Sequence, residues 1–231
     1  HQSISDIRTR EVAYCGLGLH LLGNNTITEK VLDLLNSGKC TNGGWGITLD
    51  KKNPNLLATF QASQLFHTLN QTLTIPQWFF QTFREGGCSF SPSSVIRDKI
   101  SFPATAMVNF MLTHFYQPST NEQFLSVFES TKNIISRHFE EIVRKIVSNN
   151  QDYIACEERS GFHIFGFGLA AQSLKRQGVH LINEYDLRDY FRDLKDDYFN
   201  LHSKHVPFIL ENARLIEAVR SSYDPFLYTR D

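Results

Sequence analysis

The feature that most constrains the fold is a glycine-containing stretch that occurs twice. Asn42-Gly43-Gly44-Trp45-Gly46 is followed by a polar loop and by an apolar run over residues 54–69. A weaker copy, Gly86-Gly87-Cys88-Ser89-Phe90, begins 43 residues after Gly43 and is followed by another polar loop and an apolar run over residues 103–115. A repeat of this length is typical of supersecondary units that stack and bury a continuous core between them.

The segments between these loops have the spacing of helices. Pro76 suits the first turn of a helix that carries several aromatic residues and is closed by Gly86. The longest pattern, over residues 121–148, is amphipathic, and we expect a break in it near Thr131. Apolar side chains also recur at helical spacing over residues 10–22, 26–38, 54–69, 103–115, 164–174, 186–199 and 206–219.

Mostly apolar and amphipathic helices alternate with a period of about 45 residues, which predicts helix pairs stacked side by side with the apolar members inside. We therefore expect an all-α fold, an α/α toroid or solenoid of about four to five helix pairs that forms a partial barrel. Residues 1–231 are short enough to make a single domain. Because His1 opens the chain in helix-like sequence, without an initiator Met or a signal peptide, we expect a fragment of a longer polypeptide.

Composition narrows the function classes. Lys and Arg total 23 against 24 Asp and Glu, so the net charge of -1 supplies no overall attraction to nucleic acid or acidic membranes. Glycine, proline or charge interrupts every apolar segment, so we expect no membrane span. The four cysteines form no C-x-x-C pair, which argues against a zinc knuckle or a redox motif and favours a reduced, cytoplasmic setting.

Gly43-Gly44-Trp45-Gly46, with Thr59 and Ala62 on the next helix, resembles the repeat of the terpenoid cyclase and protein prenyltransferase α/α toroid family. The second glycine stretch, with Ala104-Thr105-Ala106, is similar to the same pattern. The resemblance implies a doubled glycine that turns the chain between an outer and an inner helix, and an aromatic that packs between neighbouring repeats.

The resemblance is good over residues 26–116. Over residues 121–222 only the alternation of helices and Ser160-Gly161-Phe162 support it. The catalytic signatures of the family are missing. Asp193-Leu194-Lys195-Asp196-Asp197 has the wrong spacing for the Asp-x-Asp-Asp acid and fits a solvated helix face, and none of the cysteines has the Asp two residues before it that a family zinc site needs. We therefore expect no catalytic residue, no metal and no cofactor.

Several polar residues have two interpretations. His67 and His114 fall near the ends of corresponding inner helices, where they would be general acid/base groups of a central cavity or histidines satisfied by neighbouring carbonyls. Cys88 follows two glycines, a setting that lowers a thiol pKa, but it also replaces an aromatic and fits a small packing residue. His202 and His205 have a metal-ligand spacing without a third ligand, which favours solvent-facing side chains.

Our leading hypothesis is a non-catalytic interaction, sensor or regulatory domain of a larger protein. Its concave face or loop rim would hold a protein partner, another domain of the same polypeptide, or a hydrophobic small molecule. The alternative is an isoprenoid-handling enzyme or lipid-binding protein, whose inward phenylalanines would stabilise a cation. Asp50, Asp98 or Glu157 inside a cavity larger than about 300 Å³ would favour the enzyme. The candidate binding residues are Trp45, Phe60, His67, Phe90, Phe110, His114 and His163.

Overall fold

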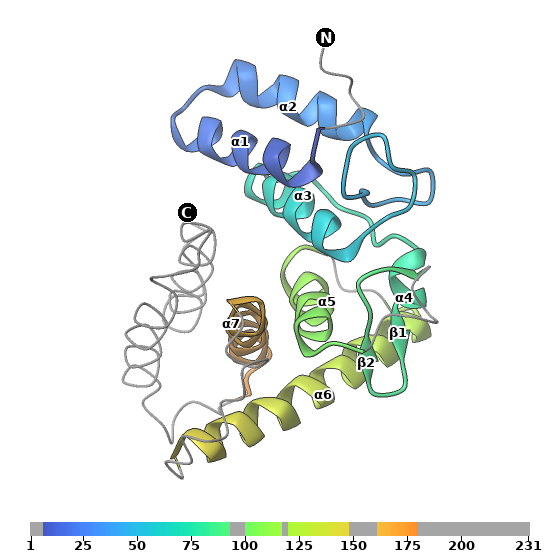
Figure 1. The fold of residues 1–231 in the computed structure, drawn as a ribbon, viewed down its shortest axis with the longest axis vertical. Helices are drawn as coiled ribbons and strands as arrows, with labels where there is room; N and C mark the ends of the chain where they lie inside the picture. The colour runs from blue at the N-terminus through green and yellow to red at the C-terminus, as the bar shows by residue number, and fades with distance from the viewer. Residues whose placement is uncertain (1–6, 93–99, 117–119, 148–160, 180–231) are drawn as a thin grey trace, which may run out of the picture.

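The computed structural model describes residues 7–92, 100–116, 120–147 and 161–179, which are mostly helical (Figure 1). The all-α class expected from the sequence is confirmed at this level. The helices expected over residues 186–199 and 206–219 lie outside the described residues. The elements are α1 (Thr9–Leu21), α2 (Asn25–Ser37), α3 (Leu56–Thr68), α4 (Trp78–Gln81), β1 (Phe83–Arg84), β2 (Gly87–Cys88), α5 (Phe102–His114), α6 (Glu122–Val147) and α7 (Gly161–Arg176).

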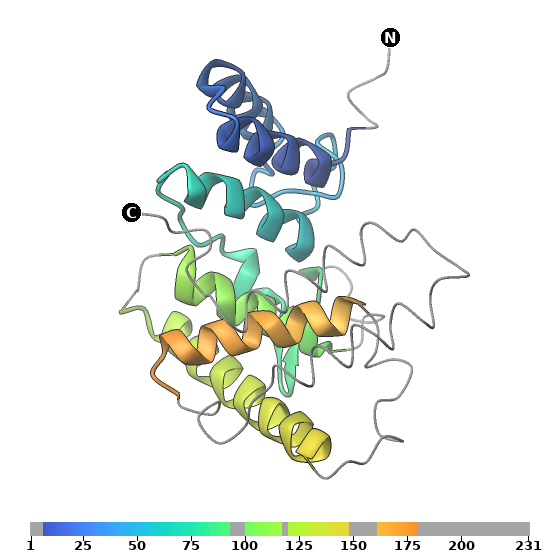
Figure 2. The same ribbon diagram turned by 90° about the vertical axis from the view of Figure 1, so that its left-hand side faces the viewer.

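The helices α1, α3, α5 and α7 pack against one another in that order, while α2 packs on α1 and α6 packs on both α5 and α7. Figure 2 shows α1, α3 and α5 following one another down the molecule, with α7 and α6 at its other end. Every residue over 58–66 in α3 and over 103–112 in α5 is buried. Helices that are covered on all sides consist mostly of small and apolar residues, and α3 and α5 have this composition, with Gln61, Gln64 and Asn109 as their larger buried polar side chains.

The two glycine loops make the same contact with the helix that follows them. The backbone N–H of Trp45 donates to the hydroxyl of Thr59 at 3.0 Å, and the backbone N–H of Cys88 donates to the hydroxyl of Thr105 at 2.9 Å. All four residues are buried. Because a buried N–H needs a partner, each threonine fixes the loop onto the first turns of its helix.

The second glycine of each pair is required by this contact. Gly44 has φ +73° and Gly87 has φ +146°, which are backbone conformations that L side chains rarely adopt. A Cβ atom on Gly44 would lie 2.8 Å from Thr59 Oγ1, and one on Gly87 would lie 2.7 Å from Thr105 Oγ1. The doubled glycines therefore let the loop backbone approach the helix closely.

The helix expected between Pro76 and Gly86 is shorter than the pattern predicted. It is confined to α4, and the chain then reverses so that β1 pairs with β2 in an antiparallel two-stranded sheet, with Phe83 opposite Cys88. Gly86 has φ +96°, which cannot continue a helix and turns the chain back instead. The aromatic residues before the turn still point inward, since Trp78 and Phe79 are buried.

The break expected near Thr131 is absent, because α6 runs without interruption through this position. The hydroxyl of Thr131 donates to the carbonyl of Val127 at 2.8 Å and accepts a hydrogen bond from Asn109 Nδ2 of α5 at 3.0 Å. A buried polar side chain with both roles filled is compatible with the middle of a helix. Thr131 therefore joins α6 to α5.

Candidate functional site

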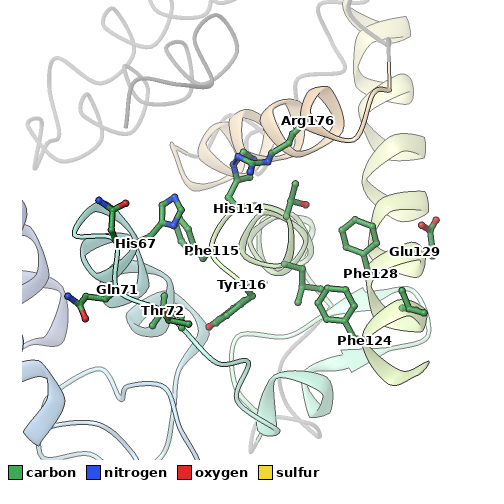
Figure 3. Close-up of a pocket in the computed structure, with 15 residues that line it drawn as sticks. His67, Gln71, Thr72, His114, Phe115, Tyr116, Phe124, Phe128, Glu129 and Arg176 are labelled. Atoms are coloured by element: carbon green, nitrogen blue, oxygen red, sulfur yellow. Dashed lines mark hydrogen bonds between the residues drawn. The ribbon is translucent and has the colours of Figure 1, made fainter. Parts of the chain in front are cut away.

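A pocket of about 680 Å³ lies where the C-terminal ends of α3, α5 and α7 meet α6 (Figure 3). Its volume is within the range of small-molecule sites. Its polar and charged lining residues are His67, Asn70, Gln71, Thr72, Thr113, His114, Glu129 and Arg176, and its apolar and aromatic lining residues are Leu73, Leu112, Phe115, Tyr116, Phe124, Leu125 and Phe128.

Three basic side chains come from equivalent places on three packed helices. His67 lies in the last turn of α3, His114 is the last residue of α5, and Arg176 is the last residue of α7. Because α3 packs on α5 and α5 packs on α7, the three helix ends come together. Cations are favoured near helix C-termini, where backbone carbonyls lack partners in the helix.

His114 is held by two neighbours. Arg176 Nη1 lies 3.2 Å from His114 Nδ1, and the His114 ring stacks on Phe110 with centroids 4.2 Å apart. Since a guanidinium can only donate, Nδ1 is the acceptor and the proton of the neutral ring is on Nε2. Nε2 is buried and has no hydrogen bond of good geometry to a described residue, although the backbone of Gln172 lies near enough to the ring to act on its pKa.

Both histidines of the pocket are kept neutral. Burial, helped by the charge of Arg176 and by His67, lowers the pKa of His114 to about 3, although the backbone of Gln172 opposes this shift. Burial and then the charge of Arg176 also lower the pKa of His67, which is half-buried and packs against Phe115 with centroids 5.1 Å apart. At neutral pH the cluster therefore carries the single positive charge of Arg176.

A polar network beneath the pocket joins α5 to α7. Gln177 Nε2 donates to Asn109 Oδ1 at 2.8 Å and to the hydroxyl of Thr113 at 3.0 Å. Asn109 is fully buried and also contacts Thr131 of α6. The network connects α5 and α6 to the residue that follows α7, so it stabilises the position of Arg176, one residue before Gln177.

Behind the pocket is a filled aromatic cluster. Phe60 lies 5.8 Å from Phe110 and 5.6 Å from Phe115, and Phe110 lies 5.3 Å from Phe115, measured between ring centroids. Phe60 is 1% exposed and Phe110 is 8% exposed. Of the three, Phe115 lines the pocket, while Phe60 and Phe110 support it from behind.

The other candidate binding residues lie elsewhere. Trp45 is buried, donates from Nε1 to the carbonyl of Leu35 at 2.8 Å and packs on Phe66. Phe90 is partly buried, and its carbonyl accepts the N–H of Leu56 at 2.8 Å. His163 is part of α7, and its side chain lies outside the described structure. Among the seven candidates, the structure brings His67 and His114 together at the pocket.

Arg176, Phe124, Phe128 and Glu129 line the pocket but were not predicted from the sequence as site residues. A signal was present for Arg176, which ends α7 as His114 ends α5. Phe124 and Phe128 belong to the apolar stripe that the sequence predicts. Nothing in the stripe itself shows that one end of it extends past α5 into a pocket.

Neither Asp50 nor Cys88 lines the pocket. Asp50 is exposed and accepts a hydrogen bond from the hydroxyl of Thr48, which lowers the pKa of its carboxyl group. Asp98 and Glu157 lie outside the described residues. Burial raises the pKa of the Cys88 thiol to about 12, which fits the packing interpretation rather than a reactive thiol.

Metal-ligating side chains are scattered over the described part of the molecule. Within the described ranges, no three His, Cys, Asp or Glu side chains come together as a metal site would require. His202 and His205 are outside those ranges. Among the helices that the structure describes, none combines the length and the apolar character needed to cross a lipid bilayer.

Comparisons of the chain with protein-family models, with curated proteins and with solved structures found no match.

Proposed function

We propose that this chain is a non-catalytic binding domain, and that the pocket at the ends of α3, α5 and α7 holds a hydrophobic small molecule or an apolar segment of a protein partner. The observation that carries the proposal is the pocket itself. It has a volume of about 680 Å³, and its lining combines apolar and aromatic side chains, most of them at α5 and α6, with a similar number of polar or charged ones. A pocket of this size that offers both apolar surface and converging polar groups is suited to hold a ligand.

The apolar wall has surface to offer a ligand. Leu125 is 47% exposed, and Phe115 and Phe128 are partly exposed. Covering such side chains removes apolar surface from water, which stabilises a complex by roughly 25 cal/mol for each Å². The wall is therefore a source of binding free energy.

The ionisable groups support binding more than acid-base catalysis. A histidine with a pKa of about 3 is a weak base at neutral pH, and Nδ1 of His114 is already occupied by Arg176. An isoprenoid-handling enzyme, the second candidate, has less support. Phe60 and Phe110, which it would use to stabilise a cation, pack against each other rather than along the pocket.

Two further expectations belong to the proposed function. We infer that α1 to α7 belong to an α/α toroid or solenoid, supported by the matching loop contacts of Thr59 and Thr105. We also infer that the domain works in the cytoplasm. Ligand binding by the pocket can be tested independently of both expectations, because it depends only on the side chains at the ends of the helices.

The test is binding of Nile red, a neutral apolar dye whose emission shifts to the blue in apolar sites. Leu125→Trp enlarges a side chain that lines the pocket, and we expect it to weaken dye binding about tenfold, or about 1.4 kcal/mol. Leu21→Trp is the control, because Leu21 is 81% exposed on α1 and is not a lining residue. The proposal is wrong if the wild-type protein shows no saturable binding, or if both variants lose it equally.

A further inference from the structure

We propose that the ligand is a small amphipathic carboxylate, with its anionic end on Arg176 and its hydrocarbon chain along the wall formed by α5 and α6. The inference rests on the proposed function, because it assumes that the pocket binds an apolar ligand. It adds the charge and the orientation of that ligand.

The pocket is chemically divided. Figure 3 shows Arg176 and His114 side by side near the end of α7, with His67 on the neighbouring α3, while Phe124, Phe128 and Glu129 extend from α6 on the other side of α5. Phe124 and Phe128 stack with centroids 5.9 Å apart. A ligand that spans the pocket therefore meets basic groups at one end and aromatic rings at the other.

Arg176 has donors to spare. In the part of the chain that the structure describes, no carboxylate lies within ion-pair distance of its guanidinium. The guanidinium contacts the uncharged His114 through one of its five N–H donors. The planar guanidinium matches the two oxygens of a carboxylate, and hydrogen bonds between charged groups are stronger than those between neutral ones.

His114 and His67 leave the positive charge of the cluster to Arg176. Nε2 of His114 is buried, and the backbone of Gln172 acts on the ring, so this nitrogen is not counted among the donors to the ligand. Burial and then the charge of Arg176 lower the pKa of both rings, which disfavours a second positive charge beside the guanidinium. Arg176 is therefore the group that attracts an anion to this end of the pocket.

The same geometry selects a single negative charge. The C-terminal ends of α3, α5 and α7 all face this part of the pocket, and their carbonyls carry partial negative charge that repels anions. One permanent cation, Arg176, offsets that repulsion for a monoanion but not for a diphosphate. Glu129, which is 3.6 Å from Lys132, opposes a second anionic group at the far end.

The experiment compares decanoate with 1-decanol, which shares the ten-carbon chain but has no charge, by calorimetric titration of the full chain at pH 7.5 below micelle concentrations. We expect decanoate to bind about tenfold more tightly than decanol, the size expected when a hydrogen-bonded charge is recognised. Arg176→Gln should remove that difference, so that decanoate and decanol bind this variant with similar affinity. Lys175→Gln is the matched control, since Lys175 is an exposed cation beside Arg176 that does not line the pocket.

Each result decides something different. Equal affinity for decanoate and decanol in the wild-type protein overturns the carboxylate inference and leaves the proposed function standing. Binding of neither compound overturns both. A preference for decanoate that survives in Arg176→Gln, or that Lys175→Gln removes to the same extent, shows that Arg176 is not the recognition group. Tighter binding of farnesyl diphosphate than of decanoate contradicts the choice of a monoanion and favours the isoprenoid alternative.

Discussion

The hydroxyl of Thr59 accepts the backbone N–H of Trp45 at 3.0 Å, which joins the first glycine loop to α3. Thr59→Val keeps the shape of the side chain but leaves this buried N–H without its partner. We expect a loss of about 1–3 kcal/mol in the free energy of unfolding, measured by urea denaturation. Thr105→Val should lower the free energy of unfolding by a similar amount, because it removes the hydrogen-bond partner of the backbone N–H of Cys88. Thr26, which is exposed, supplies the control: Thr26→Val should change stability by less than about 0.5 kcal/mol.

Gly44→Ala tests the close approach of the loop to its helix. The new Cβ atom would lie 2.8 Å from both Thr59 Oγ1 and Trp78 Cζ2. Gly23 has nearly the same φ, +74°, but a Cβ atom added there would meet no atom within 4 Å, so Gly23→Ala measures the backbone strain alone. We expect Gly44→Ala to be more destabilising by about 1–3 kcal/mol, the usual cost of overpacking. The free energy of unfolding is measured by thermal or urea denaturation. If Gly44→Ala and Gly23→Ala lower it equally, crowding at Gly44 contributes nothing.

The low pKa of His114 makes stability depend on pH. In the unfolded chain the ring takes up a proton as pH falls below about 6.5, whereas in the folded protein it stays neutral until about pH 3. Burying neutral His114 therefore costs no stability above about pH 6.5 and lowers stability as pH falls from there toward 3. The His114 contribution between pH 7 and pH 5 is about 2 kcal/mol.

His114→Gln should flatten this pH dependence in urea unfolding experiments. The charged and titratable groups that face His114 are Arg176 and His67. His67→Gln is the comparison, since burial lowers the pKa of His67 in the same direction but the side chain is less buried. Parallel curves for the wild-type protein and His114→Gln would mean that His114 is not buried as described.

The cysteines should differ in reactivity toward iodoacetamide at pH 8. Cys15 is exposed, whereas burial raises the pKa of Cys40 and raises that of Cys88 to about 12. Only the thiolate is nucleophilic, so Cys15 should be alkylated in the native protein and Cys88 only after unfolding. Peptide mapping by mass spectrometry measures the extent of alkylation at Cys15 and at Cys88. Alkylation of Cys88 as fast as Cys15 would contradict the buried position of β2.

The helices could be predicted because their patterns are long. Small and apolar residues predominate throughout α3 and α5, whereas α6 has one apolar stripe. Spacing therefore distinguishes a helix that is buried on all sides from one that is buried on a single face. The predicted end of the helix at α4 was wrong because helical spacing of aromatic residues does not report the backbone, and a glycine such as Gly86 suits a hairpin turn as well as a helix stop. The predicted break at Thr131 was wrong because the partner of this side chain, Asn109, comes from another helix.

The pocket was only partly predictable. The sequence singled out His67 and His114 because they lie near the ends of corresponding helices, and both do line the pocket. The same reasoning extends to Arg176 as well, but the sequence prediction considered only histidines as functional groups at these ends. The aromatic candidates Phe60 and Phe110 follow the inner-helix pattern, but spacing does not distinguish a side chain that fills a core from one that lines a cavity.

The central claim is that a ligand binds between the ends of α3, α5 and α7 rather than on another apolar surface. The competing surface is the exposed pair Leu21 and Leu22 at the end of α1. The most direct measurement is the set of nuclear Overhauser effects between the decanoate chain and leucine methyl groups in labelled wild-type protein. We predict contacts to Leu112 and Leu125, which line the pocket, and none to Leu21 or Leu22. Contacts to Leu21 or Leu22 without any to Leu112 and Leu125 would contradict the account.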